Sequence, residues 1–137
     1  MQTKPKIILS TLDLERLEVL LERPEYQAFP GIDALGEELA RAEVVEPEQV
    51  PPTVVTMNSC VRFEMLPGGE SFELTLVYPR DMNGDPQRIS VLAPVGSALL
   101  GLSVGQEIEW PVPGGRNIRV RIMAVTYQPE RAGDYHR

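Results

Sequence analysis

Few residues in this chain have the chemistry for catalysis or for ligand binding. The single histidine, His136, lies beside the C-terminus, where fraying is usual, whereas a general base needs a fixed position. Cys60, the single cysteine, falls in a strand-like pattern that is more typical of a small buried side chain than of a nucleophile. The adjacent glycines 68 and 69 lack the following Lys-Ser/Thr of a phosphate-binding loop and indicate a turn. The sequence therefore predicts no catalytic residue, no metal site and no cofactor.

Acidic charge is concentrated in the first part of the chain. Residues 1–50 carry 11 acidic and 5 basic side chains, whereas residues 51–137 carry 9 and 8, within a net charge of −7. Tight binding to a phosphate backbone needs clustered Lys and Arg, so direct nucleic-acid binding is not expected. Two explanations stay open for the acidic part: a solvated pair of helices, or an acidic arm that enters a basic cleft on a partner.

Hydropathy and cysteine use indicate the compartment. No apolar run approaches the roughly 20 residues that span a bilayer, and acidic residues from Asp13 onward interrupt any signal-peptide core. A single cysteine rules out an intramolecular disulfide and argues against a cysteine-based zinc site. We therefore expect a cytoplasmic protein with no membrane partner.

Two amphipathic segments near the N-terminus predict a pair of helices. Ser10 stands three residues before Asp13, a weak capping box for a first helix that Pro24 ends. Asp33 is a candidate cap for the second helix. Each helix has an apolar face, formed by Leu14, Leu17, Leu20 and Leu21 in the first and by Leu35, Leu39 and Ala42 in the second. The pattern predicts an antiparallel helical hairpin, a short coiled coil over residues 1–45 and about 18 Å long at 1.5 Å per residue.

The rest of the chain has the pattern of a small sheet. Residues 46–53 contain three prolines and no periodicity, which is typical of a linker. Pro94 and Gly101 bound one short helix. Alternation of polar and apolar residues predicts strands at residues 60–64, 72–76, 89–92, 106–110 and 117–127. The sequence thus predicts an α+β protein in which a helical hairpin precedes an antiparallel β-sheet domain with one short helix over residues 54–137.

This order of elements resembles the Gre-factor family. Residues 89–115, ISVLAPVGSALLGLSVGQEIEWPVPGG, are similar to the C-terminal signature of that family: a strand, a Pro-started helix ending in Leu-Leu-Gly, a Gly-bearing turn into a strand, and Pro-x-Gly-Gly. Residues 54–63, VVTMNSCVRF, and residues 127–135, YQPERAGDY, resemble more specifically the regulators of nucleoside diphosphate kinase within that family. The resemblance implies an FKBP-like fold for the sheet domain.

The resemblance also implies core RNA polymerase as the partner. In Gre factors a longer hairpin enters the secondary channel of the polymerase, and an Asp-x-x-Glu pair at its tip helps hold a second Mg²⁺ for transcript cleavage. Glu22 and Glu25 have that spacing, but Glu22 ends the first helix and Pro24 interrupts the local geometry. The leading hypothesis is therefore a regulator, not an enzyme, that occupies the channel without cleaving RNA, competes with Gre factors and affects the level of nucleoside diphosphate kinase.

The resemblance assigns the partner-binding residues to two places. The contact with the channel rim falls on Ala93, Pro94, Val95, Gly96 and Ser97, and the hairpin tip offers the aromatic residues Tyr26 and Phe29. Each assignment has a purely structural alternative. Pro94 could do no more than start a helix, Gly96 could do no more than pack, and one tip aromatic could fold back onto the hairpin.

Two other functions stay open. One is a cleavage-stimulating factor that uses Glu22 and Glu25. The other is a peptidyl-prolyl isomerase, suggested by the FKBP-like fold, although a fold alone does not establish a function. Its apolar pocket would draw on the aromatic residues Phe63, Phe72, Tyr78 and Trp110.

Overall fold

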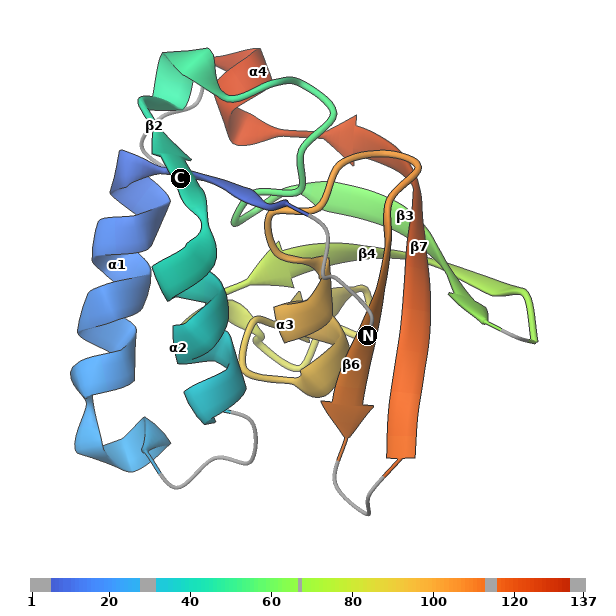
Figure 1. Cartoon of the computed structure of the whole chain (residues 1–137), viewed down its shortest axis with the longest axis horizontal. Helices are drawn as coiled ribbons and strands as arrows, with labels where there is room; N and C mark the ends of the chain where they lie inside the picture. The colour runs from blue at the N-terminus through green and yellow to red at the C-terminus, as the bar shows by residue number, and fades with distance from the viewer. Residues whose placement is uncertain (1–5, 28–31, 67, 113–115, 134–137) are drawn as a thin grey trace.

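The computed structural model describes residues 6–27, 32–66, 68–112 and 116–133 (Figure 1). Helices and a small parallel strand pair lie on one side of the molecule, and a five-stranded sheet lies on the other. The chain is therefore an α+β protein, as the sequence predicted. No helix in the described ranges is long and apolar enough to cross a membrane.

The N-terminal part contains two helices that lie side by side. Helix α1 spans Thr11–Glu22 and helix α2 spans Ile32–Arg41. The predicted start of α1 is confirmed, since the Oγ of Ser10 accepts a hydrogen bond of 3.0 Å from the backbone N–H of Asp13. The helix ends before Pro24, which begins the 3-10 turn η1, Pro24–Tyr26. Helix α2 begins one residue before the predicted cap, Asp33, which instead lies in its first turn.

The sequence did not predict the strand pair that flanks these helices. Strand β1, Ile8–Ser10, is parallel to strand β2, Glu43–Val45, with Ile8 opposite Glu43. Because α1 leads away from β1 and α2 leads back to β2, the two strands lie next to each other (Figure 1). Strands of three residues are too short for alternation to reveal them.

The main sheet has five strands in the order β5-β4-β3-β7-β6. The predicted hairpin of β3 and β4 is confirmed, and its strands pair through Phe63 and Phe72. The bounds of the strands are Cys60–Leu66 (β3), Glu70–Val77 (β4), Arg88–Ser90 (β5), Glu107–Val112 (β6) and Arg116–Tyr127 (β7).

The prediction of a wholly antiparallel sheet was wrong at one edge. Strand β5 is parallel to β4, with Thr75 opposite Arg88, so the sheet is mixed. The reason lies in the crossover between them, residues 78–87, which contains the 3-10 turn η3, Pro79–Asp81, and a left-handed Asn83. This crossover returns the chain to Thr75, within β4, so that β5 runs beside the last three residues of β4 in the same direction, whereas a tight turn would have made the pair antiparallel.

Two short helices complete the fold. Helix α3, Pro94–Leu99, begins at the predicted proline, and Gly101 follows it with the predicted left-handed backbone, φ 80°. Gly101 also contacts the N-terminal part, because its carbonyl accepts a 3.1 Å hydrogen bond from the N–H of Ile8. Helix α4, Pro129–Ala132, follows β7 and was not predicted.

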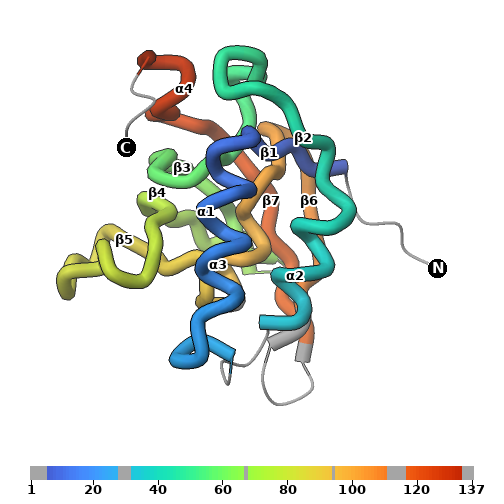
Figure 2. The backbone as a smooth tube through the Cα atoms, turned by 90° about the vertical axis from the view of Figure 1, so that its left-hand side faces the viewer, coloured from blue at the N-terminus to red at the C-terminus, as the bar shows by residue number. Residues whose placement is uncertain are grey.

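One hydrophobic core joins the helices to the sheet. The buried side chains of Ile7, Leu9, Leu17 and Leu35 belong to the same cluster as those of Phe63, Leu99, Trp110 and Ile122 from the sheet domain. Viewed from the side in Figure 2, α1 and α2 lie over the sheet domain. The chain between them, residues 46–53, contains a further 3-10 turn, η2, Pro47–Gln49.

The division at residues 46–53 can be tested with a fragment. We expect residues 50–137 to unfold cooperatively, since they contain the whole five-stranded sheet and α3. The fragment should be less stable than the full chain, because it lacks the core side chains Ile7, Leu9 and Leu17. Near-UV circular dichroism and urea titration of both proteins measure this. A fragment with no near-UV signal would show that residues 46–53 do not separate two folding units.

Candidate functional site

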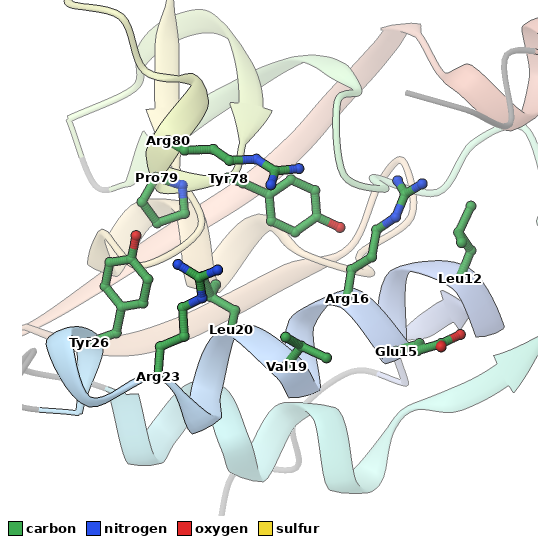
Figure 3. A pocket seen from close by; sticks show the side chains of 10 residues that line it. All are labelled: Leu12, Glu15, Arg16, Val19, Leu20, Arg23, Tyr26, Tyr78, Pro79 and Arg80. Atoms are coloured by element: carbon green, nitrogen blue, oxygen red, sulfur yellow. The ribbon is translucent and has the colours of Figure 1, made fainter.

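A hollow of about 340 Å³ lies between α1 and the start of the β4–β5 crossover (Figure 3). Arg16 and Leu20 line it from α1, because residues four apart share one face of a helix, and Arg23 lines it from the C-terminal cap of that helix. Tyr78 and Arg80 line it from the crossover. The hollow therefore joins a helix of the N-terminal part to a loop of the sheet domain.

Tyr78 is the most buried aromatic side chain of this hollow, with 6% of its surface exposed. Burial raises the pKa of its hydroxyl well above the ordinary value, and the nearby Asp13 adds to this, whereas Arg16 and Arg80 oppose it. Arg16 lies close enough to the hydroxyl to lower its pKa as a donor, but within the described residues no group meets hydrogen-bond geometry with this hydroxyl. The guanidinium of Arg80 lies over the Tyr78 ring, 6.0 Å from its centroid. The phenol therefore stays protonated and can donate a hydrogen bond.

The predicted tip residues divide between the hollow and the undescribed part of the chain. Tyr26 lies in η1 and lines the hollow. Its side chain is partly buried against the hydrophobic core, so this aromatic residue packs on the protein itself. Phe29 lies outside the described residues, and so does His136.

The predicted rim residues lie at the start of α3, and two of the five are buried. The Oγ of Ser97 donates a 2.6 Å hydrogen bond to the carbonyl of Val91. A Cβ on Gly96 would lie 2.0 Å from the carbonyl oxygen of Ser90, so no larger residue fits there without a backbone shift. Ala93 and Val95 are half-buried, and Pro94 begins the helix. Surface for a partner is thus offered by Ala93 and Val95 more than by Gly96 and Ser97.

The two candidate carboxylates, Glu22 and Glu25, are exposed, and no metal-ligand group forms around them among the described residues. The carboxylate of Glu25 pairs with the guanidinium of Arg23 at 3.2 Å, and Glu22 is the last residue of α1. No group of three potential ligands is present among the described residues. A lone ion-paired carboxylate gives a cation little charge to hold it.

The aromatic residues of the isomerase alternative do not gather at the hollow beside α1. Phe63 and Trp110 are each 1% exposed and belong to the core, whereas Phe72 is 42% exposed and stacks on Phe63 with ring centroids 5.6 Å apart. Of the four, Tyr78 alone lines the hollow beside α1.

Sequence reasoning missed the most unusual polar residue of the fold, Asp13. Its carboxylate is 3% exposed and accepts a 3.1 Å hydrogen bond from the backbone N–H of Met57. Desolvation raises its pKa from 3.8 to about 7, and the charge of Glu130 adds to this, while the Met57 hydrogen bond and Arg16 lower it. The weak capping-box pattern indicated Asp13 as a helix-start residue, but it gave no signal for this contact across 44 residues.

The two sequence segments with the more specific resemblance pack against each other. Thr56 donates a 2.7 Å hydrogen bond to Glu130, and the side chain of Gln128 donates one of 2.7 Å to the carbonyl of Val54. Gln128 is fully buried, so these bonds hold α4 against the segment that leads into β3. The segments therefore form one structural unit next to Asp13.

Comparisons with known proteins match both parts of the chain. The family model described as "Transcription elongation factor, GreA/GreB, C-term" matches residues 50–127, and the one described as "Rnk N-terminus" matches residues 5–45. The "Regulator of nucleoside diphosphate kinase" of Escherichia coli (strain K12) is 50% identical over 133 residues, which are 97% of this chain and 98% of that protein. The chain belongs to the GreA/GreB family, in the branch of regulators of nucleoside diphosphate kinase.

Relatives within the GreA/GreB family include elongation factors. "Transcription elongation factor GreA" of Helicobacter hepaticus (strain ATCC 51449 / 3B1) is 34% identical over 134 residues, with 91% of this chain and 81% of that protein covered. A solved structure, "Prokaryotic transcription elongation factor GreA/GreB from Nitrosomonas europaea", has 64% identity and a TM-score of 0.71. It covers 90% of this chain and 100% of that chain, so both parts of the GreA/GreB-like fold are shared.

The buried Asp13 makes a pH dependence of stability testable. Its pKa of about 7 in the folded state exceeds the 3.8 of an exposed aspartate, so the folded state binds the extra proton. The extra proton stabilises the folded state. This stabilisation is fully present below pH 3.8 and is lost as the pH rises through 7. Between pH 5 and pH 8 the free energy of unfolding should fall by about 2 kcal/mol.

Asp13→Asn should remove most of this fall, because the amide oxygen can still accept from the N–H of Met57. Urea unfolding at the two pH values measures it. Asp33→Asn, which removes an exposed carboxylate from α2, is the matched control and should keep the slope of the native protein. An equal slope in Asp13→Asn would show that Asp13 is not the titrating group.

Proposed function

We propose that this protein binds core RNA polymerase at the secondary channel, occupies the channel without cleaving RNA, and competes there with Gre factors. Its effect on the level of nucleoside diphosphate kinase would then follow from altered transcription. The observation that carries the proposal is the match to the family along both parts of the chain, from residue 5 to residue 127. The names of the relatives, transcription elongation factors and kinase regulators, support the same assignment.

The length of α1 supports binding without cleavage. Its 12 residues make a helix about 18 Å long at 1.5 Å per residue, and α2 has 10 residues. We take the two helices as an antiparallel hairpin and the sheet as the FKBP-like domain that docks at the channel rim. A hairpin this short reaches into a channel but stops short of a distant catalytic centre.

The chemistry at the tip also supports binding without cleavage. Glu25 is exposed and paired with Arg23, and Glu22 sits on the other side of Pro24 at the end of α1. Holding a catalytic Mg²⁺ needs at least two oxygen ligands that converge on one point. Both carboxylates are nevertheless exposed near the tip, so cleavage stimulation is the second candidate function and is tested directly.

We expect no stimulation of transcript cleavage in backtracked elongation complexes, since the tip does not present a converging carboxylate pair. The measurement is shortening of a labelled transcript in the presence of this protein, with a GreA factor as the positive control. Cleavage that requires this protein, and that Glu22→Ala or Glu25→Ala abolishes, would replace the proposal with the second candidate.

Affinity for core polymerase should depend more on the start of α3 than on the tip. Charged residues in place of Pro94 and Val95 would place an unpaired charge in the rim contact, which costs binding free energy. Alanine in place of Tyr26 and Phe29 would remove only a loosely held contact at the tip. Equilibrium binding should therefore weaken more for the first double variant. The second should still compete with a GreA factor, although less well.

The controls separate lost contacts from lost folding. Val104→Asp places the same kind of charge at a side chain that is 41% exposed and lies outside both proposed contacts, so it should bind like the native protein. Thermal unfolding of each variant checks the fold, since Val95 packs partly against the core. If the tip variant loses binding and the Pro94/Val95 variant keeps it, the assignment of the docking surface to the start of α3 is wrong.

A further inference from the structure

The hollow beside α1 gathers positive charge in a protein of net charge −7. Arg16 from α1, Arg23 from the cap that follows α1 and Arg80 from η3 line it, and Glu15 is the one acidic side chain among its lining residues. Figure 3 shows Arg80 beside the Tyr78 ring and Arg16 on the other side of Tyr78, where the hydroxyl points. Guanidinium groups from two elements that face one space suit an anion, above all a phosphate, which accepts several of their hydrogen bonds at once.

The Tyr78 hydroxyl is a second and independent indication of a ligand. Tyr78 is 6% exposed, its hydroxyl has no hydrogen-bond partner in the described part of the chain, and the residue lines the hollow. Buried hydroxyl groups are nearly always satisfied, so one without a partner at the wall of a hollow indicates a missing acceptor. A phosphate oxygen is such an acceptor, and the neutral phenol is the form that donates to it.

The other end of the hollow is aromatic. Figure 3 places Tyr26 and Arg23 at one end and Arg16 near the opposite end, with the Tyr78 hydroxyl directed toward Arg16. Tyr26 is half-buried, which leaves part of its side chain accessible. A tyrosine ring and a guanidinium plane both stack on planar heterocycles. The hollow thus has an anionic end and a planar end.

From these observations we infer that the hollow binds a nucleotide, with its phosphate between Arg16, Arg80 and the Tyr78 hydroxyl and its base against Tyr26. A volume of about 340 Å³ lies at the lower limit of small-molecule sites, which suits one nucleotide and excludes a dinucleotide. A compact hollow with two chemically different ends fits such a ligand better than an extended acidic peptide, which needs a long groove with repeated pockets. The inference does not rest on binding to polymerase.

The test is calorimetric titration of the full-length protein with ADP, GDP and UDP in turn, and with adenosine and inorganic pyrophosphate. At least one nucleoside diphosphate should bind more tightly than pyrophosphate, which lacks the base, and adenosine, which lacks the phosphates. Tyr78→Phe keeps the ring and removes the donor, so it should weaken that nucleotide about tenfold without loss of thermal stability. Tyr26→Leu should weaken the nucleotide and leave pyrophosphate unchanged.

Arg80→Gln tests the charge and has a matched control. Arg80 is exposed, so its replacement should weaken the nucleotide about tenfold and spare the fold. Arg62→Gln removes the same charge from an exposed side chain on β3 outside the hollow and should change affinity by less than about twofold. The inference is wrong if none of the three nucleotides binds, if Tyr78→Phe and Arg80→Gln bind as Arg62→Gln does, or if pyrophosphate binds as tightly as the nucleotides.

Discussion

The position of α1 against the sheet domain depends on a buried carboxylate at its first turn. The hydroxyl of Ser10 accepts from the N–H of Asp13, while the Asp13 side chain turns away from the helix and accepts from the N–H of Met57. A carboxylate 3% exposed has lost most of its hydration, and its pKa of about 7 records that cost. The bond is retained because the Met57 N–H would otherwise be a buried donor without a partner. One residue thus joins α1 to the segment that leads into β3.

The hollow beside α1 follows from this attachment. Once the first turn of α1 is held, helical geometry sets the positions of Arg16 and Leu20, which are four residues apart, and Arg23 follows at the C-terminal cap of the helix. The same face of the helix must therefore meet Tyr78 and Arg80 where β4 ends. The parallel placement of β5 matters here as well, because it requires the crossover that carries η3 across to α1.

Local patterns predicted the local elements of this fold. The cap at Ser10, the β3–β4 hairpin and the left-handed Gly101 are each specified within a few residues, and each is confirmed. The parallel pairing of β5 and the β1–β2 pair were not predicted, because they depend on where a loop and a helix return the chain. Asp13 and the hollow escaped prediction for the same reason: Arg16 and Arg80 are 64 positions apart, and no motif joins them. The two docking surfaces, by contrast, were assigned through resemblance and stay predictions.

A ligand in the hollow would act on the same joint that Asp13 holds. Arg16 belongs to α1 and Arg80 to the sheet domain, so an anion that contacts both bridges the two parts of the fold. It binds tightly only when α1 is seated, because an α1 detached from the sheet domain separates the guanidinium groups. By linkage, a bound ligand would favour the seated position of α1, by the difference between the free energies with which the ligand binds the seated and the detached states. If the protein binds in the polymerase channel as proposed, occupancy of the hollow and binding to the polymerase would be coupled through the orientation of α1.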